Sequence, residues 1–503
     1  MEKNKILVEP SDYDTAIANG YNEDLAPLPA EQRKWGFFNY FTLWMGSVHN
    51  VPNYLAVGGF LFLGMSPVNV MLALILSSFG VMGLLILNGL YGFDYGIPST
   101  MALRSTYGSK GAKLPGVLRG LIAAIMWYGL QTYAGSKALL ILIGKIYPAF
   151  LNIGGGFEFL GIGLPALICF IIFWTINLII GIGGGDSISK FTAVLNPLIY
   201  IVFGGMVIWA VRVNGGLGPI LNYSSGVTRT SSNIFIYLMI ISSVLSVWAA
   251  PGVSSSDFGR NAKDFKSFSL GQGVGLFVSY LLFAFSSVFI LIGATVYYQT
   301  PMWDVLEIVN KWDSLIAVAF SMVVLLMTTI STNATGNIIP AGYQLATLFP
   351  KKVDFRKGVI LASIISFVIC PWKLMENQNS IYLFLDIIGS LMGPIAGTMI
   401  AHYLFIVKRD IWLTRIYAKE VNLYKPDVNY AAYGSTIVGA VVPLTFKFIE
   451  PLAKYSQVSW IIAFIVAFLL YVWLGKTQLR NQTNRTADEM PIHLATKENC
   501  KVK

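Results

Sequence analysis

Neutral side chains with indole, amide or hydroxyl groups lie within apolar stretches of this sequence. They are Asn50, Trp127, Gln131, Trp248, Ser331, Thr332, Asn333 and Asn337. Trp127 and Gln131 stand four residues apart, as do Asn333 and Asn337, so within helices each pair shares a face. An indole can stack on a flat ring for about 1 to 3 kcal/mol, and an amide offers donors and an acceptor to the ring's edge. The pattern indicates non-covalent recognition of a small neutral planar heterocycle.

The composition places these residues in a membrane protein. Of 503 residues 55% are hydrophobic and 12% are charged, whereas a soluble domain carries about 25% charged residues. Apolar runs recur across one transmembrane domain, residues 36–475, which lies between an N-terminal segment, 1–35, and a tail, 476–503. The net charge of +10 sits in short loops and not on one face, so a lipid bilayer is the expected partner and nucleic acid is not.

Twelve stretches are long enough to cross a bilayer as helices, which takes about 20 residues. We number them spans 1 to 12, and they cover residues 36–63, 68–92, 116–146, 159–183, 190–212, 233–256, 270–297, 312–335, 357–374, 380–406, 429–449 and 456–475. The predicted fold class is an all-α membrane protein.

Lys and Arg alternate between the two sides of these spans. Of 35 such residues, 27 fall on the side of the N-terminus, Arg119 among them, 7 fall on the other side, and Lys137 lies inside span 3. Positive residues concentrate in cytoplasmic loops. The count therefore predicts a multi-pass protein with both termini in the cytoplasm.

Spans 1 and 6 are interrupted by polar and helix-breaking residues. Pro52 interrupts the stretch from Gly46 to Asn53, and Pro251 with Gly252 interrupts the stretch from Trp248 to Ser256. An offset of 205 carries Gly46 to Pro251 and Trp127 to Thr332, which indicates two repeats, 36–212 and 233–406, followed by two further helices, 429–475. A repeat of five helices must insert inverted. Paired broken helices in such repeats mark the substrate and ion site of LeuT-like secondary transporters.

Oxygen groups beside the breaks could hold a coupling ion. Span 8 offers the hydroxyls of Thr328, Ser331 and Thr332, and the break in span 1 frees carbonyl groups at Gly46 and His49. Oxygen ligands of this kind suit Na⁺ as a possible metal. His49 and Asp386 are titratable groups inside spans, so H⁺ coupling is equally open. No cofactor and no catalytic residue is expected.

These stretches resemble the nucleobase:cation symporter-1 family, and within it the bacterial allantoin permeases, over about residues 20 to 475. The matching segments are Asn22-Glu-Asp-Leu, Trp44-Met-Gly-Ser-Val-His-Asn-Val-Pro, Arg104-Ser-Thr-Tyr-Gly, Ile125-Met-Trp-Tyr-Gly-Leu-Gln, Phe203-Gly-Gly-Met, Ser256-Asp-Phe, Thr329-Ile-Ser-Thr-Asn-Ala-Thr-Gly-Asn, Pro371-Trp-Lys-Leu-Met-Glu and Gly393-Pro. The resemblance implies the cytoplasmic (inner) membrane of a bacterium as the location.

The resemblance also implies roles for the polar residues. The ring would lie between Trp127 and Trp248, with its edge bonded by Gln131, Asn50 and Asn337. The cation would be held by the residues already described, Gly46, His49, Thr328, Ser331 and Thr332. Val247 stands where a hydantoin-carrying relative has Gly, and Thr328 where that relative has a small apolar residue. The size of the ring that is carried and the dependence of uptake on sodium are therefore the properties in which this chain can differ from that relative.

The predicted function is cation-coupled uptake of allantoin, or of a related hydantoin or purine-derived ureide, by alternating access. A uracil or purine permease of the same family is the alternative. The sequence has no G-x-x-x-x-G-K-[ST] segment that would bind ATP for primary active transport. Its three His residues form no cluster typical of a membrane enzyme. A channel is distinguished by counterflow of labelled substrate, since only a carrier exchanges. No charged residue is expected beside the polar positions of spans 1, 3 and 8. A monomer and a disordered tail after Arg480 are also predicted.

Overall fold

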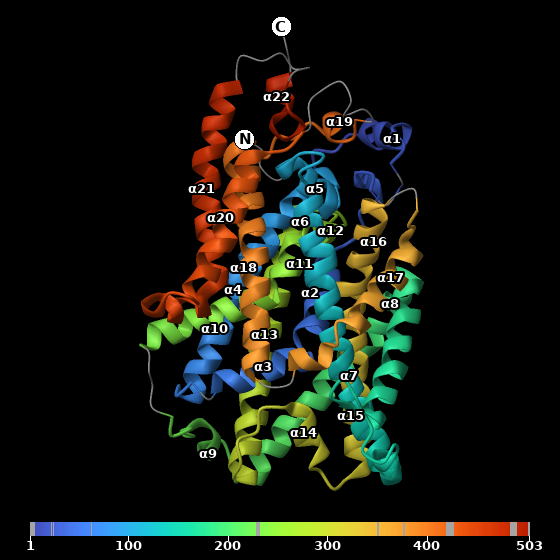
Figure 1. Ribbon diagram of the computed structural model, residues 1–503, viewed down its shortest axis with the longest axis vertical. Coiled ribbons are helices and arrows are strands. Elements are labelled where there is room, and N and C mark those ends of the chain that lie inside the picture. The colour runs from blue at the N-terminus through green and yellow to red at the C-terminus, as the bar shows by residue number, and fades with distance from the viewer. Residues whose placement is uncertain are drawn as a thin grey trace.

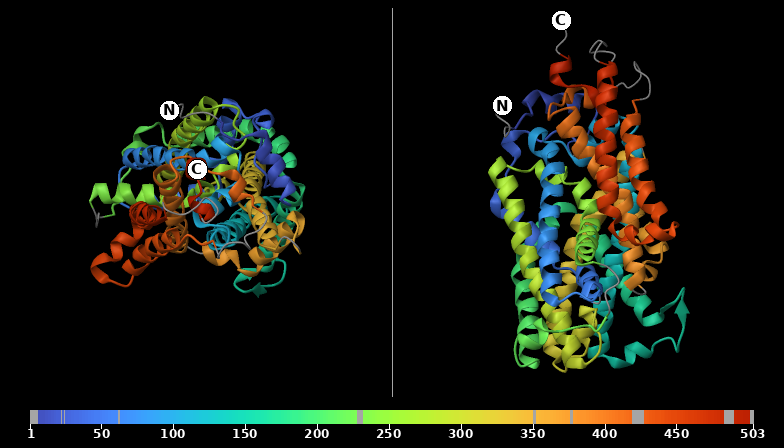
Figure 2. Two further views of the ribbon diagram at one scale, coloured as in Figure 1. Left: turned by 90° about the horizontal axis from the view of Figure 1, so that it is seen from above. Right: turned by 90° about the vertical axis from the view of Figure 1, so that its left-hand side faces the viewer.

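The computed structural model is an elongated bundle of helices (Figure 1). It describes residues 6–21, 23, 25–61, 63–227, 232–349, 352–375, 378–418, 427–482 and 490–500. Helices α1 (Pro10–Ala18) and α22 (Lys497–Cys500), from the two ends of the chain, lie at the same end of the bundle (Figures 1 and 2). We call this end the terminal face and the other end the opposite face.

Each predicted span corresponds to helices of the structure. Spans 1 to 5 are α2 (Phe37–Val48) with α3 (Val51–Leu61), α4 (Pro67–Tyr95), α6 (Lys113–Val117) with η2 (Leu118–Ala123) and α7 (Ala124–Ile146), and the two arms of α8 (Leu164–Val213). Spans 6 to 10 are α10 (Asn233–Val247) with α11 (Ala249–Val253) and α12 (Ser256–Gly259), α13 (Phe265–Tyr298), α15 (Leu315–Asn333) with η4 (Ala334–Ile338) and α16 (Ile339–Leu348), α17 (Phe355–Val368), and α18 (Gln378–Ala401) with η6 (His402–Ile406). Spans 11 and 12 are α20 (Tyr430–Phe446) and α21 (Ser459–Gln482).

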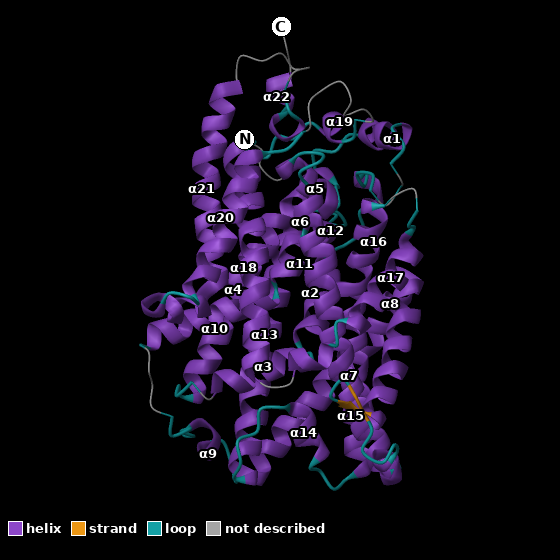
Figure 3. Cartoon of the chain, in the orientation of Figure 1, coloured by secondary structure: helices purple, strands orange, loops and turns teal. Residues whose placement is uncertain are grey.

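Short elements connect the spans. Those not yet named are η1 (Ala30–Gln32), α5 (Ser99–Tyr107), η3 (Pro148–Asn152), β1 (Glu158–Phe159), β2 (Ile162–Gly163), α9 (Gly218–Leu221), α14 (Val305–Asn310), η5 (Pro371–Met375), α19 (Leu413–Ile416), η7 (Glu450–Val458) and η9 (Ile492–Leu494). The antiparallel pair β1 and β2 is the one sheet among the described residues, and helix dominates the rest (Figure 3).

Six helical stretches of the described chain are by themselves long and apolar enough to cross a membrane. They are Pro67–Tyr95, Leu164–Gly183, Phe265–Tyr298, Leu315–Ala346, Ser380–Ile406 and Glu450–Asn481. Four shorter apolar helices add parts of spans 1, 5, 6 and 11. Spans 1 and 6 fall short because each is broken into separate helices.

The break in span 1 lies at His49 and Asn50, between α2 and α3. Backbone groups freed inside a membrane must find partners within the protein. The Asn50 side chain accepts a hydrogen bond from the backbone N–H of Asn53 (3.1 Å), and the Asn53 side chain donates to the carbonyl of Val48 (2.8 Å). The two amides therefore stabilise the break from within.

The break in span 6 is stabilised by its neighbours instead. Helix α10 ends at Val247, Trp248 leaves the helical conformation, and α11 lasts only five residues. The Ser255 hydroxyl donates to the Leu85 carbonyl of α4, and the Ser256 hydroxyl donates to the Ile97 carbonyl (2.7 Å). Both predicted breaks are confirmed.

The two arms of α8 form one helical run of 50 residues. A straight helix of that length would extend about 75 Å. Both ends of α8 nevertheless lie near the end of α7. Leu164 lies against Gly154, shortly after α7. The Trp209 ring contacts the tilted ring of Trp312 (5.3 Å between centroids), whose carbonyl accepts a hydrogen bond from Lys145 of α7. The run must therefore reverse direction between Gly183 and Pro197, as separate spans 4 and 5 require.

The helices of spans 1 to 9 fall into two packed groups. In the first helix group, spans 1, 2, 6 and 7, helices α2 and α4 pack on α13, and α10 and α12 pack on α4. In the second helix group, spans 3, 4, 8 and 9, helices α7, α8, α15 and α17 pack on one another. The Asn333 side chain donates to the carbonyl of Tyr128, 205 positions earlier (3.2 Å). This separation equals the repeat offset, so the two residues lie near the axis that relates the repeats.

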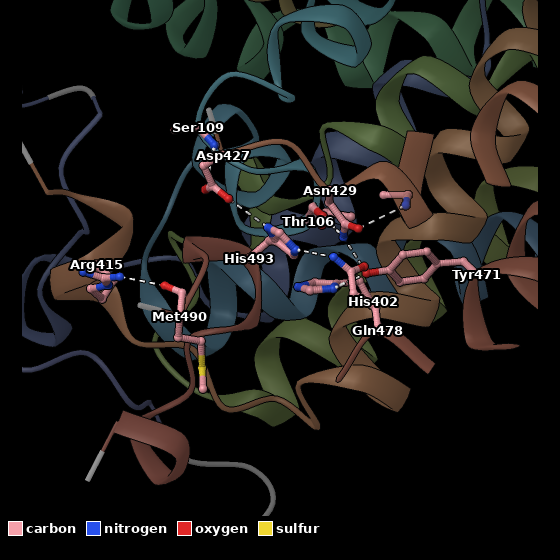
Figure 4. Close-up of polar contacts among 11 residues, drawn as sticks. Thr106, Ser109, His402, Arg415, Asp427, Asn429, Tyr471, Gln478, Met490 and His493 are labelled. Carbon is pink, nitrogen blue, oxygen red and sulfur yellow. Dashed lines mark hydrogen bonds and ion pairs between the residues drawn. The ribbon is translucent and has the colours of Figure 1, made fainter. Parts of the chain in front are cut away.

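The tail is ordered where the structure describes it, so the prediction of disorder is wrong for residues 490–500. His493 is 2% exposed and lies between the Asp427 carboxylate (3.0 Å) and the Gln478 side chain (3.1 Å) (Figure 4). Leu494 is also buried, and the Ala495 carbonyl accepts from the N–H of Trp412 (3.3 Å). A polar composition concealed these few anchoring contacts. Residues 483–489 and 501–503 lie outside the described part of the chain.

Candidate functional site

A small cavity lies where the two helix groups meet. It is lined by Pro52, Leu55 and Ala56 of α3, Trp127 and Leu130 of α7, Val247 of α10, and Ile381, Phe384 and Leu385 of α18. Its volume, about 10 Å³ measured as room for the centre of a water molecule, is that of about one water. The site is therefore closed, and a heterocyclic ring would require the walls to separate.

The two predicted indoles lie in different surroundings. Trp127 is 6% exposed, lines the cavity, and meets the ring of Phe384 edge-on (4.9 Å). Trp248 is turned toward Trp44 (5.4 Å) and donates its indole N–H to the Tyr280 hydroxyl. Among the described residues, Val247 and not Trp248 lines the cavity from this part of span 6. The structure thus brings Trp127 and the break of span 1 together, whereas Trp248 is occupied elsewhere in this closed state.

The predicted amides differ in how far their groups are already used. Asn50 donates to the Ser47 carbonyl (2.9 Å) besides bonding inside the break, and Asn337 donates to the side chain of Asn333 (3.0 Å). Gln131 is 3% exposed, and its Oε1 has no hydrogen-bond partner among the described residues. A buried unbonded polar group costs about 1 to 3 kcal/mol. Gln131 is thus the amide best prepared to bind a ligand.

Trp127 adds a second unused group on the same face of α7. Its indole Nε1 also lacks a hydrogen-bond partner within the described chain. The four-residue spacing to Gln131 places a donor and an acceptor side by side. A flat molecule with alternating N–H and C=O groups matches this pair.

The predicted cation residues lie on α2 and α15, which pack against each other. The hydroxyl oxygen of Thr332 is buried without a hydrogen-bond partner in the described residues, whereas the hydroxyl of Thr328 donates to the Leu325 carbonyl (2.8 Å). The Ser331 carbonyl accepts from the hydroxyl of Thr335 (2.9 Å). The Thr332 hydroxyl is therefore a buried oxygen that no described protein group uses, and a cation could bind it. Gly46 lies buried within α2, near its end.

The two titratable residues predicted inside spans are both engaged. His49 is 1% exposed and hydrogen-bonded through Nδ1 to the Tyr54 hydroxyl (3.1 Å), with the rings of Tyr200 and Phe203 close by (5.4 and 5.3 Å). Asp386 forms an ion pair with Lys447 (3.2 Å).

One residue of the site was misplaced by sequence reasoning. Arg119 counts among the positive loop residues there, yet it is 4% exposed and lies in η2, within span 3. Its Nε donates to the Ala250 carbonyl in the broken span 6 (2.6 Å), and its Nη2 donates to the Gly336 carbonyl beside Asn337 (3.3 Å). The expectation of no charged residue beside these positions is wrong. The signal was present, because the boundary drawn at residue 116 already includes Arg119.

A twelve-span helical bundle with two broken helices, and a closed site beside those breaks, defines the class of LeuT-like secondary transporters. The chain belongs to the family of permeases for cytosine/purines, uracil, thiamine and allantoin, whose model matches residues 27–463. The expected membership of the nucleobase:cation symporter-1 family and the expected fold class are thereby confirmed.

Individual relatives cover nearly the whole chain. The chain is 53% identical to the putative allantoin permease of Escherichia coli (strain K12), over 94% of this chain and 98% of that protein. It is 37% identical to the allantoin permease of Bacillus subtilis (strain 168), over 90% and 92%. A solved nucleobase-cation-symport-1 family transporter, in a closed conformation with bromovinylhydantoin bound, shares the fold with a TM-score of 0.72 and 22% identity, over 91% of this chain and 96% of that one.

Proposed function

We propose that this chain carries out secondary active uptake of allantoin, or of a closely related hydantoin or purine-derived ureide, across the cytoplasmic membrane of a bacterium. The observation that carries the proposal is the pair on α7, where Trp127 Nε1 and Gln131 Oε1 are buried without partners among the described residues. Among the residues that the structure describes, no ionisable side chain lines the cavity. A neutral, flat molecule with N–H and C=O groups on its edge fits both facts, and two similar proteins bear the name allantoin permease.

The closed cavity supports transport by alternating access. Its walls come from both helix groups, with Pro52 and Val247 on one side and Trp127 on the other. A relative shift of the two groups would widen the cavity and open it to one face at a time. In the proposed bound state Trp127 and Trp248 enclose the ring, while Gln131, Asn50 and Asn337 bond its edge.

The proposed coupling ion is Na⁺ or H⁺. For Na⁺ the proposed ligands are the carbonyls of Gly46 and His49 with the hydroxyls of Thr328, Ser331 and Thr332. The unpartnered hydroxyl of Thr332 supports this assignment. We further propose a monomer whose terminal face lies in the cytoplasm, with the segment boundaries 1–35, 36–475 and 476–503 given above.

The test is uptake of radiolabelled allantoin into cells that express the chain. Uptake is expected to be saturable, to be reduced by excess hydantoin, and to show counterflow in preloaded cells. Replacement of Na⁺ by choline, and separately addition of a protonophore, identifies the coupling ion. If uracil or xanthine competes and allantoin does not, the chain is instead a nucleobase permease; uptake without counterflow would contradict a carrier.

A further inference from the structure

Arg119 is a buried cation whose bonds are to backbone carbonyls. It is 4% exposed, and the ion pairs found among the described residues do not include it. Asp257, which follows the break of span 6, uses its carboxylate on the N–H and hydroxyl of Ser99 (2.7 and 2.8 Å). A buried charge is tolerated only with good hydrogen bonds. The carbonyls of Ala250 and Gly336 supply these bonds for Arg119.

Both carbonyls belong to irregular helix segments. Ala250 lies in the short helix α11, where its carbonyl also accepts from the N–H of Ser254 (3.2 Å). Gly336 lies in η4, a π-helical segment of span 8. Such segments often occur at functional sites. Arg119 therefore donates hydrogen bonds to the backbone at two places where that backbone departs from α-helix.

Arg119 lies between the cavity and the terminal face. It precedes Trp127 by eight residues, which is about 12 Å along a helix axis. Eight residues of α-helix make about 2.2 turns, but the π-helical segment η2 takes an extra residue in its turn. This segment turns Arg119 toward the face of span 3 that carries Trp127.

The contacts of Arg119 cross the boundary between the two helix groups. Gly336 belongs to the second helix group, as Arg119 itself does, while Ala250 belongs to the first. If the groups separate on the terminal side, the bond to Ala250 must break and the bond to Gly336 can persist. The Nη1 of Arg119 has no partner among the described residues. The closed state thus leaves both N–H donors of Nη1 unused.

We propose that Arg119 is a positioning residue of the transport cycle: its bond to Ala250 keeps the terminal side of the site closed, and release of that bond accompanies opening to the terminal face. The proposal rests on alternating access by this chain. It does not depend on which heterocycle is carried, because its test measures opening directly.

The test measures how fast a cysteine at position 254 reacts with a maleimide. Ser254 is 5% exposed, so Ser254→Cys should react slowly while the terminal side is closed. The measurement uses the full-length chain in membranes, with Cys169, Cys370 and Cys500 replaced by serine. Arg119→Gln removes the charge and the bond to Ala250. The labelling rate is expected to rise about tenfold, as for loss of one charge-assisted hydrogen bond, and the KM for uptake is expected to rise because fewer molecules face outward.

A matched control separates this role from simple structural support. Arg33 is equally buried, at 4% exposed, and also donates to backbone carbonyls, those of Leu28 and Phe93. Its contacts lie on one side of the boundary, so Arg33→Gln should leave the labelling rate of folded protein unchanged. Arg119→Lys keeps the charge and should give an intermediate rate, which provides a second measurement if Arg119→Gln is poorly produced. Equal rates in folded wild type, Arg119→Lys and Arg119→Gln would overturn the proposal.

Discussion

Span 3 carries a cation on each side of the candidate site, and the two are bound in different ways. Arg119, toward the terminal face, donates to backbone carbonyls and is 4% exposed. Lys137, toward the opposite face, pairs with the carboxylate of Asp304 (2.8 Å), and its side chain is 29% exposed. The contact of Arg119 on the terminal side is buried and formed with the backbone. The contact of Lys137 on the opposite side is partly exposed and formed between side chains.

The partner of Lys137 is itself fixed in place. Asp304 is 0% exposed and accepts from the N–H of Leu306 (2.9 Å) at the start of α14. Its neighbour Trp303 lies so close to α3 that a Cβ added at Gly58 would come within 2.5 Å of the Trp303 carbonyl oxygen. The Lys137 to Asp304 pair thus ties the second helix group to the end of the broken span 1. Only the lysine side of this pair is partly exposed, so solvent can stabilise the ammonium but not the carboxylate when the pair opens.

The largest expected effect on uptake comes from the candidate site, which lies between Arg119 and Lys137 along span 3. Trp127→Ala removes the ring that lines the cavity, and Gln131→Ala removes the unpartnered acceptor one turn away. Stacking on Trp127 is worth about 1 to 3 kcal/mol, and leaving a buried ligand group without its hydrogen bond to Gln131 costs about as much. Either change should therefore lower allantoin uptake by up to about 100-fold. The controls are Trp209→Ala in α8 and Gln457→Ala in η7, which are not among the residues that line the cavity, and both should retain uptake. Uptake near the wild-type rate in both site variants, at equal membrane expression, would defeat the site assignment.

The next effect concerns the opposing wall of the cavity. Val247→Gly removes a side chain that faces the cavity from the first helix group. Because a pocket discriminates by about tenfold or more per methylene, the preference for a bulkier 5-substituted hydantoin over allantoin should rise about tenfold. Competition assays with a series of hydantoins measure this ratio. An unchanged ratio would mean that Val247 does not set ring size.

A smaller effect is expected at the opposite face. Asp304→Asn leaves the ammonium of Lys137 beside a neutral amide, and Lys137→Gln removes the charge from the other side. Since Lys137 is partly exposed, solvent screens the pair, and the coupling energy should be about 1 kcal/mol. In a double-mutant cycle on uptake, the double variant should be less impaired than the two single losses combined. Strict additivity would show that the pair does not act as a unit.

The sequence predicts the two breaks well, because Pro52 and Pro251 act locally. The roles of Trp127 and Gln131 in binding stay a prediction, which rests on their spacing along one helix. Arg119 was misplaced because a count of positive residues treats every Arg near a span end as part of a loop. Only the packed structure shows that carbonyls from two other spans reach it. Likewise, no local pattern reveals that Trp248 turns toward Tyr280, since that contact joins different helices.

The C-terminal tail, residues 490–500, shows the same limit of prediction from the sequence. His493 meets Asp427, 66 positions earlier, and this pairing requires the folded bundle. Composition reports the average polarity of such a segment and not its few anchors. The prediction of disorder followed from that average.

The smallest effect should come from the solvent side of the terminal face. Lys497 bonds Glu9 (2.8 Å), and this hydrogen bond, with the charge of the ammonium, lowers the pKa of Glu9 below its usual value. A carboxylate with a lowered pKa stabilises the fold above its ordinary value near 4.3, and this contribution is lost as the pH falls further. Because the Glu9 side chain is 62% exposed, the contribution should stay well under about 1 kcal/mol.

Lys497→Gln should therefore leave uptake at pH 7 within about 1.5-fold of wild type and change thermal stability only slightly. Any difference between the two proteins should disappear as the pH falls through the lowered pKa of Glu9, because Glu9 is then protonated in both. Thermal unfolding of the purified protein at a series of pH values measures this. A loss of uptake as large as that expected for Arg119→Gln would show that exposed contacts, and not the buried guanidinium, hold the terminal side closed.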